Sequence, residues 1–381
     1  MNAFQLSERL TRWLSRGEGH WSPPEEARLA KAVAELSELY TRRREALTKE
    51  VPGRAHSMAR LHFFLPRDAG KVTHALEALS EEVLAPRARC PRLLDLGAGL
   101  GTSTLGAAAY FEGTPETREL SVEAWDTDPV ALSIMRHVTD HATQLGLPPI
   151  SLETHAGSLA HAPRGARYDL ILMGLVLNEL SFDLEARAEL LRGLCQHLAP
   201  GGVLLVVEPA LRASSRALME VRDRLAATPA APHVLGPCLH HAPCPLMSRA
   251  RDWCHAELRG ELQPPLARVA AAAGLRQSRL TYAWLALGSE PPSGSSRGAR
   301  VVSGPLRSKG KLELDLCHAG GQTRLMRLER ERCADNDAMD ALGRGDRLWL
   351  RGAEWSAGRL RLRPGMSVTT DAPTPGGDRS E

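Results

Sequence analysis

The sequence has few aromatic residues, few lysines and no long apolar run, and each absence limits what the protein can be. No stretch of about 18 apolar residues occurs, so we expect no transmembrane helix and no membrane partner. The first residues, MNAFQLSERLTRWLSR, lack the continuous apolar core of a signal peptide. We therefore expect the protein in a reducing compartment, either the cytoplasm of a bacterium or the mitochondrial matrix if the chain is eukaryotic. We also expect it to be a monomer.

The scarcity of lysine makes arginine the main source of positive charge. Only five lysines occur, and the formal net charge is +3, which is too small by itself to show nucleic-acid binding. Arginine grips phosphate groups through its planar fork, so the position of the arginines matters more than their total. The length of 381 residues is enough for two or three domains.

Residues 1–88 have a helical pattern with no strand-like alternation. The segment ARLAKAVAELSELYTRRREAL has apolar residues at helical spacing, and its core-facing positions are Leu29, Val33, Leu36 and Leu39. A second helix is expected over KVTHALEALSEEVL, residues 71–84. The run Arg42–Arg44 is interpreted either as a solvated helix end or as a surface facing RNA.

Residues 89–288 alternate strands and helices, which predicts a parallel sheet covered on both faces. Helices are expected around Pro129–Leu145 and Asp183–Leu198. LAPGGVLLVVEP is interpreted as a helix end, a turn and a strand, and LRQSRLTYAWLALGS as a closing strand pair. The expected strands of this Rossmann-like α/β core are Arg92–Leu96, Ser121–Asp126, Ile150–Thr154, Tyr168–Met173 and Val203–Val207.

The rest of the chain changes character. Residues 289–300, SEPPSGSSRGAR, are typical of a linker. Residues 301–364 alternate apolar and polar side chains between short glycine-containing turns and are rich in arginine, which predicts a small basic antiparallel β domain. Residues 365–381 are predicted to be disordered.

A glycine-rich loop, LLDLGAGLGTST, joins the first expected strand to a helix. Glycine lets the backbone turn sharply and approach a ligand, and the helix start offers free N–H groups. The spacing lacks the third glycine of a dinucleotide fingerprint. With its acidic residue it instead resembles motif I of class I S-adenosylmethionine-dependent methyltransferases. That resemblance implies a cofactor site at Asp95, Gly97, Gly99, Gly101, Asp126, Gly157 and Ser158.

The catalytic position has no clear candidate in the sequence. The expected fourth strand ends in MGLVLNELSF, which contains no Pro-Pro-aromatic motif and no cysteine nucleophile. Asn178 and Glu179 lie near the expected cleft, but the same residues suit a helix cap and an acidic first turn. We therefore expect binding of the methyl donor and name no catalytic base, so the sequence does not establish an enzyme.

Three cysteines are clustered in residues 233–258, an insertion that contains GPCLHHAPCPLMSRARDWCHAE. Cys238, Cys244 and Cys254 have neither the paired spacing of a zinc ribbon nor that of a ferredoxin. A fourth ligand from His240, His241 or His255 would suit zinc, whereas Cys317 would make four thiolates for zinc or an iron–sulfur cluster. Buried or free thiols are the remaining interpretation.

These blocks together resemble one family. PCLHHAPCPL followed by DWCH, downstream of VLNEL, and the block KLELDLCHAGGQTRLMRLER are similar to the ribosomal small-subunit methyltransferase-like assembly factors, which include mitochondrial methyltransferase-like protein seventeen and bacterial members. The resemblance implies a [4Fe–4S] cluster and a role with the small ribosomal subunit and its rRNA, in assembly and in rRNA methylation where turnover occurs. It implies as cluster ligands Cys238, Cys244, Cys254 and Cys317.

One other function fits the same sequence. A methyltransferase acting on a small molecule or a protein, with zinc in a structural role at the cysteines, needs the same glycine loop and the same thiols. The sequence alone does not separate it from the ribosomal role.

Overall fold

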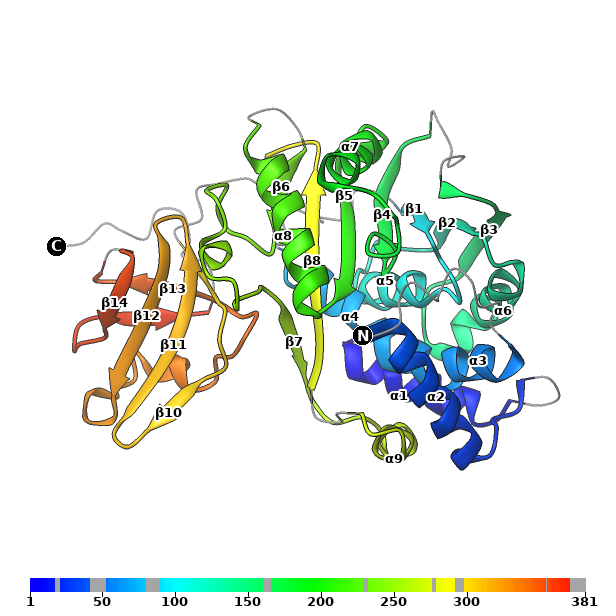
Figure 1. The fold of residues 1–381 in the computed structure, drawn as a ribbon, viewed down its shortest axis with the longest axis horizontal. Helices are drawn as coiled ribbons and strands as arrows, with labels where there is room; N and C mark the ends of the chain where they lie inside the picture. Colours follow the sequence, from blue (N-terminus) through cyan, green and yellow to red (C-terminus); the bar gives the residue numbers. More distant parts are fainter. Residues whose placement is uncertain are drawn as a thin grey trace.

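Two sheets organise the chain, one in each lobe of the computed structural model (Figure 1). None of the described helices is long and apolar enough to cross a membrane. The structure describes residues 1–17, 21–41, 53–79, 89–159, 166–228, 232–275, 279–291, 298–353 and 355–370.

The N-terminal region is helical, as predicted. α2 (Glu26–Thr41) buries all four core-facing positions expected from its spacing. The expected second helix begins earlier, because α4 (Leu65–Glu77) starts with Pro66, whose fixed φ suits a first helical turn. Residues 80–84 of that expectation, and Arg42–Arg44, lie outside the described residues. The other elements are α1 (Ala3–Leu14), α3 (Arg54–Ala59) and the π-helical turn η3 (Arg60–Phe64).

The large sheet confirms the Rossmann-like α/β core. Its order is β3-β2-β1-β4-β5-β8-β6, with β7 also paired to β8. The first five strands are parallel and β8 runs antiparallel to β5. The strands are β1 (Arg92–Leu96), β2 (Leu120–Asp126), β3 (Ile150–Ala156), β4 (Tyr168–Gly174), β5 (Leu198–Pro209), β6 (His233–Gly236), β7 (Ala256–Arg259) and β8 (Arg279–Gly288).

Helices cover both faces of this sheet because its strands are apolar on both sides. Along β4, Leu170 and Leu172 join one buried cluster, and Ile171 and Met173 join the other. α1, α4 and α5 pack together on the first face, while α7 and α8 pack on the second. The covering helices are α5 (Thr102–Glu112), α6 (Pro129–Thr139), η4 (Ala142–Leu145), α7 (Leu184–Cys195) and α8 (Arg212–Ala226).

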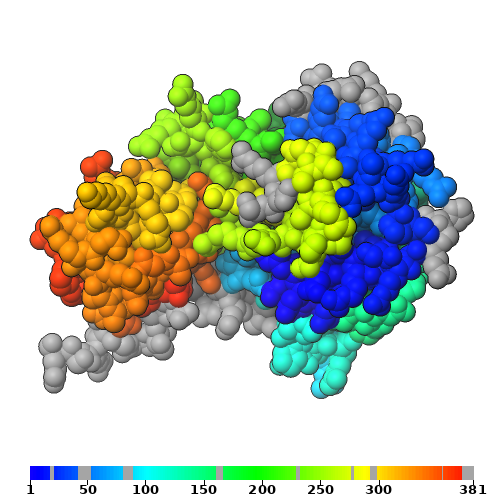
Figure 2. Space-filling view, turned by 90° about the horizontal axis from the view of Figure 1, so that it is seen from below, coloured from blue at the N-terminus to red at the C-terminus, as the bar shows by residue number. Residues whose placement is uncertain are grey.

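α9 (Pro264–Ala272) lies apart from this sheet and packs against α2, where their apolar side chains share a third buried cluster. Figure 2 shows the N-terminal helices in blue beside the yellow-green segment that contains α9. The helical region therefore covers the lower edge of the α/β core as Figure 1 is drawn.

Three local predictions for the core are wrong. The segment 198–209 is one strand, β5, and its glycines make no separate turn, although Gly201 has φ 71°. LRQSRLTYAWLALGS contributes a single strand, β8, and its partners come from β5, β6 and β7. The expected helix over Pro129–Leu145 is split into α6 and η4, because the backbone leaves the α-helical region at His141, where φ is −103° and ψ is 13°.

The small lobe is a second sheet around its own apolar core. The strands are antiparallel, as predicted, except that β12 and β14 pair in parallel. Both flanks differ from prediction, since β9 begins inside the expected linker at Ala299 and β15 lies in the expected disordered tail. Its elements are β9 (Ala299–Val301), β10 (Leu306–Ser308), β11 (Lys311–His318), β12 (Gly321–Leu328), η7 (Glu329–Glu331), η8 (Asp337–Asp340), β13 (Arg347–Arg351), β14 (Gly358–Arg361) and β15 (Ser367–Thr369).

Candidate functional site

The glycine loop lies at the carboxyl edge of the large sheet, between β1 and α5. Its three glycines have φ values of 69°, 52° and 82°, which side chains rarely adopt. An ideal Cβ on Gly97 would lie 2.2 Å from Cγ2 of Val176, so the loop has no room for one there. The strand order reverses between β1 and β4: β2 and β3 follow β1 toward one edge of the sheet, and β5 follows β4 toward the other. Ligands of open α/β sheets bind at such a switch point.

Asp95 lies beneath this loop and is fully buried. Its Oδ2 accepts hydrogen bonds from the N–H of Thr104 at 3.2 Å and from its hydroxyl at 2.7 Å, which ties β1 to the first turn of α5. Burial raises the pKa of Asp95 to about 7, and the nearby Asp126 carboxylate adds to the rise. Asp95 therefore holds the shape of the loop from below.

Asp126 ends β2 beside the loop, as the sequence predicted. Its two carboxylate oxygens accept hydrogen bonds from the N–H groups of Gly99 at 2.7 Å and Asp128 at 2.8 Å. The carboxylate is thus fixed at the edge where a ribose would bind in the fold that the motif resembles. Gly157 lies next to it, since its N–H donates to the Asp126 carbonyl oxygen at 2.9 Å.

The structure brings the other predicted cofactor residues to the same edge. Ser158 follows Gly157 at an exposed position after β3. Trp125 and His155, on the adjacent ends of β2 and β3, stack with ring centroids 4.5 Å apart. All seven residues predicted to hold the cofactor are therefore neighbours in β1, β2, β3 or the loops that follow them, and their binding role remains a prediction.

The turn after β4 differs from the helix cap considered for Asn178. α7 begins at Leu184, and its cap is Asp183, whose side chain accepts a hydrogen bond from the N–H of Ala186. Asn178 instead donates from Nδ2 to the Leu175 carbonyl at 2.9 Å, within a turn where Leu175 has φ 66°. The Asn178 N–H also donates to the buried carboxylate of Glu208 at 3.3 Å.

Arg60 is a residue of this edge that the sequence patterns did not indicate. It begins the π-helical turn η3 and its Nη1 donates to Oδ2 of Asp128 at 3.1 Å. An ideal Cβ on Gly99 would lie 3.0 Å from Nη2 of Arg60, so the guanidinium covers the middle of the glycine loop. A π-helical turn has no signature in helical or strand periodicity, which explains the omission.

The cysteine-rich segment is held by one face of α8. Arg216 donates to the carbonyl oxygens of Arg249 at 2.9 Å and Asp252 at 2.8 Å. Three residues further, the Met219 sulfur accepts the N–H of Cys254 at 3.2 Å. Residues three apart on a helix share a face, so the spacing R-x-x-M-x-x-R in the sequence was a signal for this clamp.

Arg222 and Asp223 complete the clamp. Arg222 is 3% exposed and donates to the carbonyl oxygens of His240 and, at 2.6 Å, Ala242. The Asp223 carboxylate accepts the N–H of Cys244 at 3.0 Å and also binds Arg222 at 2.7 Å. The backbone of the segment is therefore fixed on α8 at several points. Its two ends enter the large sheet as β6 and β7, so the segment 233–258 is not a separate insertion.

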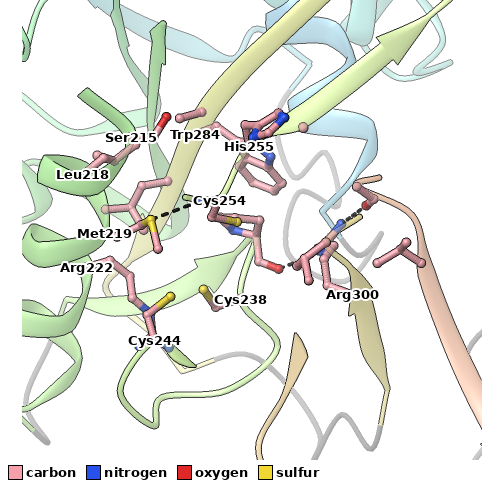
Figure 3. A pocket seen from close by; sticks show the side chains of 17 residues that line it. Ser215, Leu218, Met219, Arg222, Cys238, Cys244, Cys254, His255, Trp284 and Arg300 are labelled. Atoms are coloured by element: carbon pink, nitrogen blue, oxygen red, sulfur yellow. Dashed lines mark hydrogen bonds between the residues drawn. The ribbon is translucent and has the colours of Figure 1, made fainter. Parts of the chain in front are cut away.

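Three of the predicted ligands line one cavity of about 40 Å³. Figure 3 shows Cys238, Cys244 and Cys254 around it, with Arg222 on one side and Arg300 on the other. Burial raises the pKa of the Cys244 thiol to about 11 and that of Cys254 to about 12, and the neighbouring Cys238 adds to both. Such thiols stay protonated at neutral pH unless a cation replaces the proton.

Cys317 joins this group from the small lobe. It lies on β11, shares a buried apolar cluster with Cys244 and Met219, and is 8% exposed. Burial raises the pKa of its thiol, and the three other thiols raise it further. The structure therefore brings together all four cysteines that the sequence marked, over a separation of more than sixty residues.

The three histidines considered as ligands are placed differently. His240 is buried, with Nε2 at 3.3 Å from the Cys317 sulfur and Nδ1 at 3.1 Å from the Ala242 carbonyl oxygen. His255 lines the cavity and stacks on Trp253, with ring centroids 5.8 Å apart. His241 is exposed. Cys195 is buried in the core beside the large sheet and lies outside the group.

Buried arginines surround the thiols. Arg300 is 5% exposed and donates to the carbonyl oxygens of Pro237 at 2.8 Å and Gly345 at 2.7 Å, which joins the two lobes. Burial lowers the pKa of Arg300 to about 10, which still leaves it charged at neutral pH. Together with Arg222 and Arg344, it offsets negative charge that four thiolates would bring into this interior.

The four cysteines can be compared with the ligand sets of a single metal ion and of a cluster. Within the residues that the structure describes, no three His, Cys, Asp or Glu side chains are arranged to hold one metal ion. In a [4Fe–4S] cluster each of four thiolates binds its own iron, so the sulfurs need not converge on one point. Four cysteines, two of them buried and two half-buried, with arginines nearby fit the ligand set of such a cluster.

Comparison with known proteins agrees with this architecture. The profile of a family described as mitochondrial small ribosomal subunit Rsm22 matches residues 54–336, which is 283 of 381 residues. Comparison with curated protein sequences gives no match.

The chain is also similar to solved methyltransferase structures. One is a methyltransferase from Pyrococcus furiosus, with 13% identity, a TM-score of 0.32 and coverage of 52% of this chain and 75% of that one. The N-methyltransferase NodS from Bradyrhizobium japonicum WM9, in complex with S-adenosyl-L-homocysteine, has 16% identity, a TM-score of 0.32 and coverage of 59% and 87%. PKMT2 from Rickettsia typhi, in complex with AdoHcy, has 11% identity, a TM-score of 0.31 and coverage of 64% and 62%.

Proposed function

The chain belongs to the mitochondrial small ribosomal subunit Rsm22 family, and from this premise we propose that it binds S-adenosylmethionine and a [4Fe–4S] cluster and acts on the small ribosomal subunit. In this role it contacts rRNA during assembly, in the bacterial cytoplasm or in the mitochondrial matrix if the chain is eukaryotic. The observation that carries the proposal is the group of four cysteines at the joint between the two lobes.

The cysteine group gives the two lobes a shared centre. Cys238, Cys244 and Cys254 come from the large lobe and Cys317 from the small one. A bound cluster supplies a covalent link between segments that are otherwise joined by hydrogen bonds such as those of Arg300. The position of the small lobe, and of any surface it offers to RNA, then depends on the cluster.

The glycine loop supports binding of the methyl donor. Its left-handed glycines allow the backbone to turn closely at the start of α5, where a ligand can approach it, and Asp126 is fixed beside them. S-adenosylmethionine, when bound, supplies a transferable methyl group. The side chain of Asn178 is used within its own turn, so we assign no methyl-transfer step to any residue.

The RNA-facing part of the proposal rests on a subset of the basic residues. Many arginines of the small lobe are paired, for example Arg324 with Asp315 at 2.7 Å and Arg361 with Glu331 at 2.6 Å. Those that are exposed and form no ion pair within the described part of the chain are Lys309, Arg330, Arg351, Arg359 and Arg363. Such charges are available to phosphates.

Lys309 and Arg330 provide the test of that surface. They lie close together, since the Glu329 N–H donates to the Gly310 carbonyl oxygen at 3.0 Å. The double variant K309E/R330E is expected to weaken rRNA binding and to lower the slope of its salt dependence by about one for each phosphate group that is no longer neutralised. R324Q, which removes a guanidinium already paired with Asp315, is the control and is expected to change neither.

The metal is tested by anaerobic purification. We expect brown protein with about four iron and four sulfide per chain, calorimetric binding of S-adenosylmethionine, and co-sedimentation with small ribosomal subunits. Zinc without sulfide would contradict the cluster and would favour a methyltransferase with a structural zinc site. Absence of co-sedimentation by the iron-loaded protein would contradict the ribosomal role.

A further inference from the structure

Arg60 has a structural setting that the proposed function does not use. It stands at the start of η3, where the helix from α3 to α4 widens into a π-helical turn. Insertion of such a turn into an α-helix costs regular hydrogen bonding and is found frequently at functional sites. Here the turn directs the long cationic side chain of Arg60 over the glycine loop, and this side chain is 21% exposed.

Asp128 holds this guanidinium in position. One carboxylate oxygen of Asp128 caps α6 by accepting the N–H groups of Val130 at 3.0 Å and Ala131 at 3.1 Å. The other accepts Nη1 of Arg60 at 3.1 Å. Within the described residues this is the hydrogen bond that the guanidinium makes, so the donors on Nη2, beside Gly99, are available to a ligand.

The charges around the loop are mostly negative. Asp126 and Asp128 are carboxylates at its rim. These groups suit the hydroxyls, the sulfonium and the ammonium of S-adenosylmethionine but would repel its carboxylate. Arg60 is the guanidinium that the structure places against the loop, and a guanidinium binds a carboxylate through two parallel donors.

We propose that Arg60 binds the carboxylate of the methyl donor, with Asp128 as the residue that positions it. The inference rests on the proposed binding of S-adenosylmethionine and deepens it by naming the residue that recognises the amino-acid part. Tyr40 of α2 also lies near Arg60, whose charge lowers the Tyr40 pKa against a larger rise caused by burial. The N-terminal helices thus contribute directly to cofactor recognition.

The test compares two ligands that differ only by the carboxylate. Affinity for S-adenosylmethionine and for decarboxylated S-adenosylmethionine is measured by calorimetry on the iron-loaded chain and on its R60Q variant. A charge-assisted hydrogen bond is worth enough to reduce affinity by roughly 10- to 150-fold when it is removed. We expect that loss for S-adenosylmethionine alone, with the decarboxylated ligand bound equally by both proteins.

Each other result overturns the assignment in a recognisable way. An equal loss for both ligands means that Arg60 only supports the loop, and an unchanged affinity for both means that it does not contact the ligand. If the wild-type chain binds neither ligand, the proposed cofactor itself is wrong. R60K, which keeps the charge but not the fork, checks that the loss is not caused by misfolding, and we expect it to retain part of the affinity.

Discussion

His240 Nε2 lies 3.3 Å from the sulfur of Cys317, although the two residues are 77 positions apart and belong to different lobes. His240 is itself held by Arg222, which donates to its carbonyl oxygen. A chain of contacts therefore runs from α8, through the cysteine-rich segment, to β11. The relation explains why a change at Cys317 is expected to act on both lobes.

Replacement of Cys317 is expected to separate ribosome binding from cofactor binding. C317S removes the one proposed ligand that comes from the small lobe, so the cluster no longer fixes that lobe. We expect rRNA or small-subunit affinity to fall by about tenfold or more, a loss of at least about 1.4 kcal/mol. Affinity for S-adenosylmethionine is expected to stay unchanged, because the glycine loop lies elsewhere in the large sheet.

A variant of a second cysteine in the small lobe serves as the control for C317S. Cys333 is half-buried and lies outside the group of four. C333S is expected to keep both its iron and its ribosome affinity, measured by iron analysis and co-sedimentation. Ribosome binding of normal strength by iron-free C317S would contradict the idea that the cluster positions the small lobe.

Arg222 is expected to be essential to the cysteine-rich segment, unlike its neighbour Arg224 on the same helix. R222M removes the guanidinium that donates to the carbonyl oxygens of His240 and Ala242, and it leaves the Asp223 carboxylate with only the N–H of Cys244 as a donor. The loss of these hydrogen bonds is expected to destabilise the chain by about 1–3 kcal/mol, and we expect lower iron content as well. Chemical denaturation and iron analysis measure the two effects.

The comparison with Arg224 makes the result specific. Arg224 is exposed and forms an ion pair with Glu185 at 2.7 Å on the protein surface. R224M is expected to leave iron content and the denaturation midpoint unchanged. Equal behaviour of the two variants would show that the clamp on the cysteine-rich segment is unimportant.

Asp95 is expected to make stability depend on pH. Its pKa in the folded chain is about 7, against an ordinary value of 3.8, because burial disfavours the carboxylate. Between these values the folded state holds a proton that the unfolded state has lost, so this contribution stabilises at low pH and declines as pH rises toward 7. We expect the free energy of unfolding of wild type, relative to D95N, to fall by about 2 kcal/mol from pH 5 to 7.

The free energy of unfolding is compared between wild type and D95N because other groups titrate in the same pH range. Burial lowers the pKa of His62 to about 4, which makes its contribution decline in the opposite direction, as pH falls below 6.5. T104S keeps the hydroxyl that donates to Asp95 and is expected to follow the wild-type pH profile. Parallel curves for wild type and D95N would contradict the raised pKa.

Substitution by alanine is expected to lower the stability of the protein at Gly97 and to raise it at Gly193. At Gly97 a Cβ would lie 2.2 Å from Val176, and φ is 69°, so G97A is expected to destabilise by more than about 1 kcal/mol and to weaken cofactor binding. At Gly193 in α7 a Cβ meets nothing within 4 Å, so G193A is expected to stabilise by about 0.5–1 kcal/mol. Thermal unfolding of both variants checks the pair, and destabilisation by G193A would contradict the account of the free space.

Local patterns in the sequence determined a large part of the fold. β1 was predicted with its observed bounds, and the core-facing side of α2 followed from helical spacing. These elements are governed by short-range periodicity, which a single sequence displays. The same reasoning failed at Ala299 and at Ser367–Thr369, where pairing with β13 overrides a composition typical of loops.

The sequence by itself marked the residues that are predicted to carry the chemistry: the glycines after Asp95, the acid at Asp126 and the four cysteines. Tertiary structure alone decided how these residues are placed relative to one another. It placed Cys317 beside the cysteine-rich segment, buried Arg222 and Arg300 near the thiols and paired many arginines of the small lobe with acids. It also brought Arg60 over the loop through a π-helical turn. The reason is physical: contact, burial and charge pairing depend on distances between segments remote in the chain, which no local pattern records.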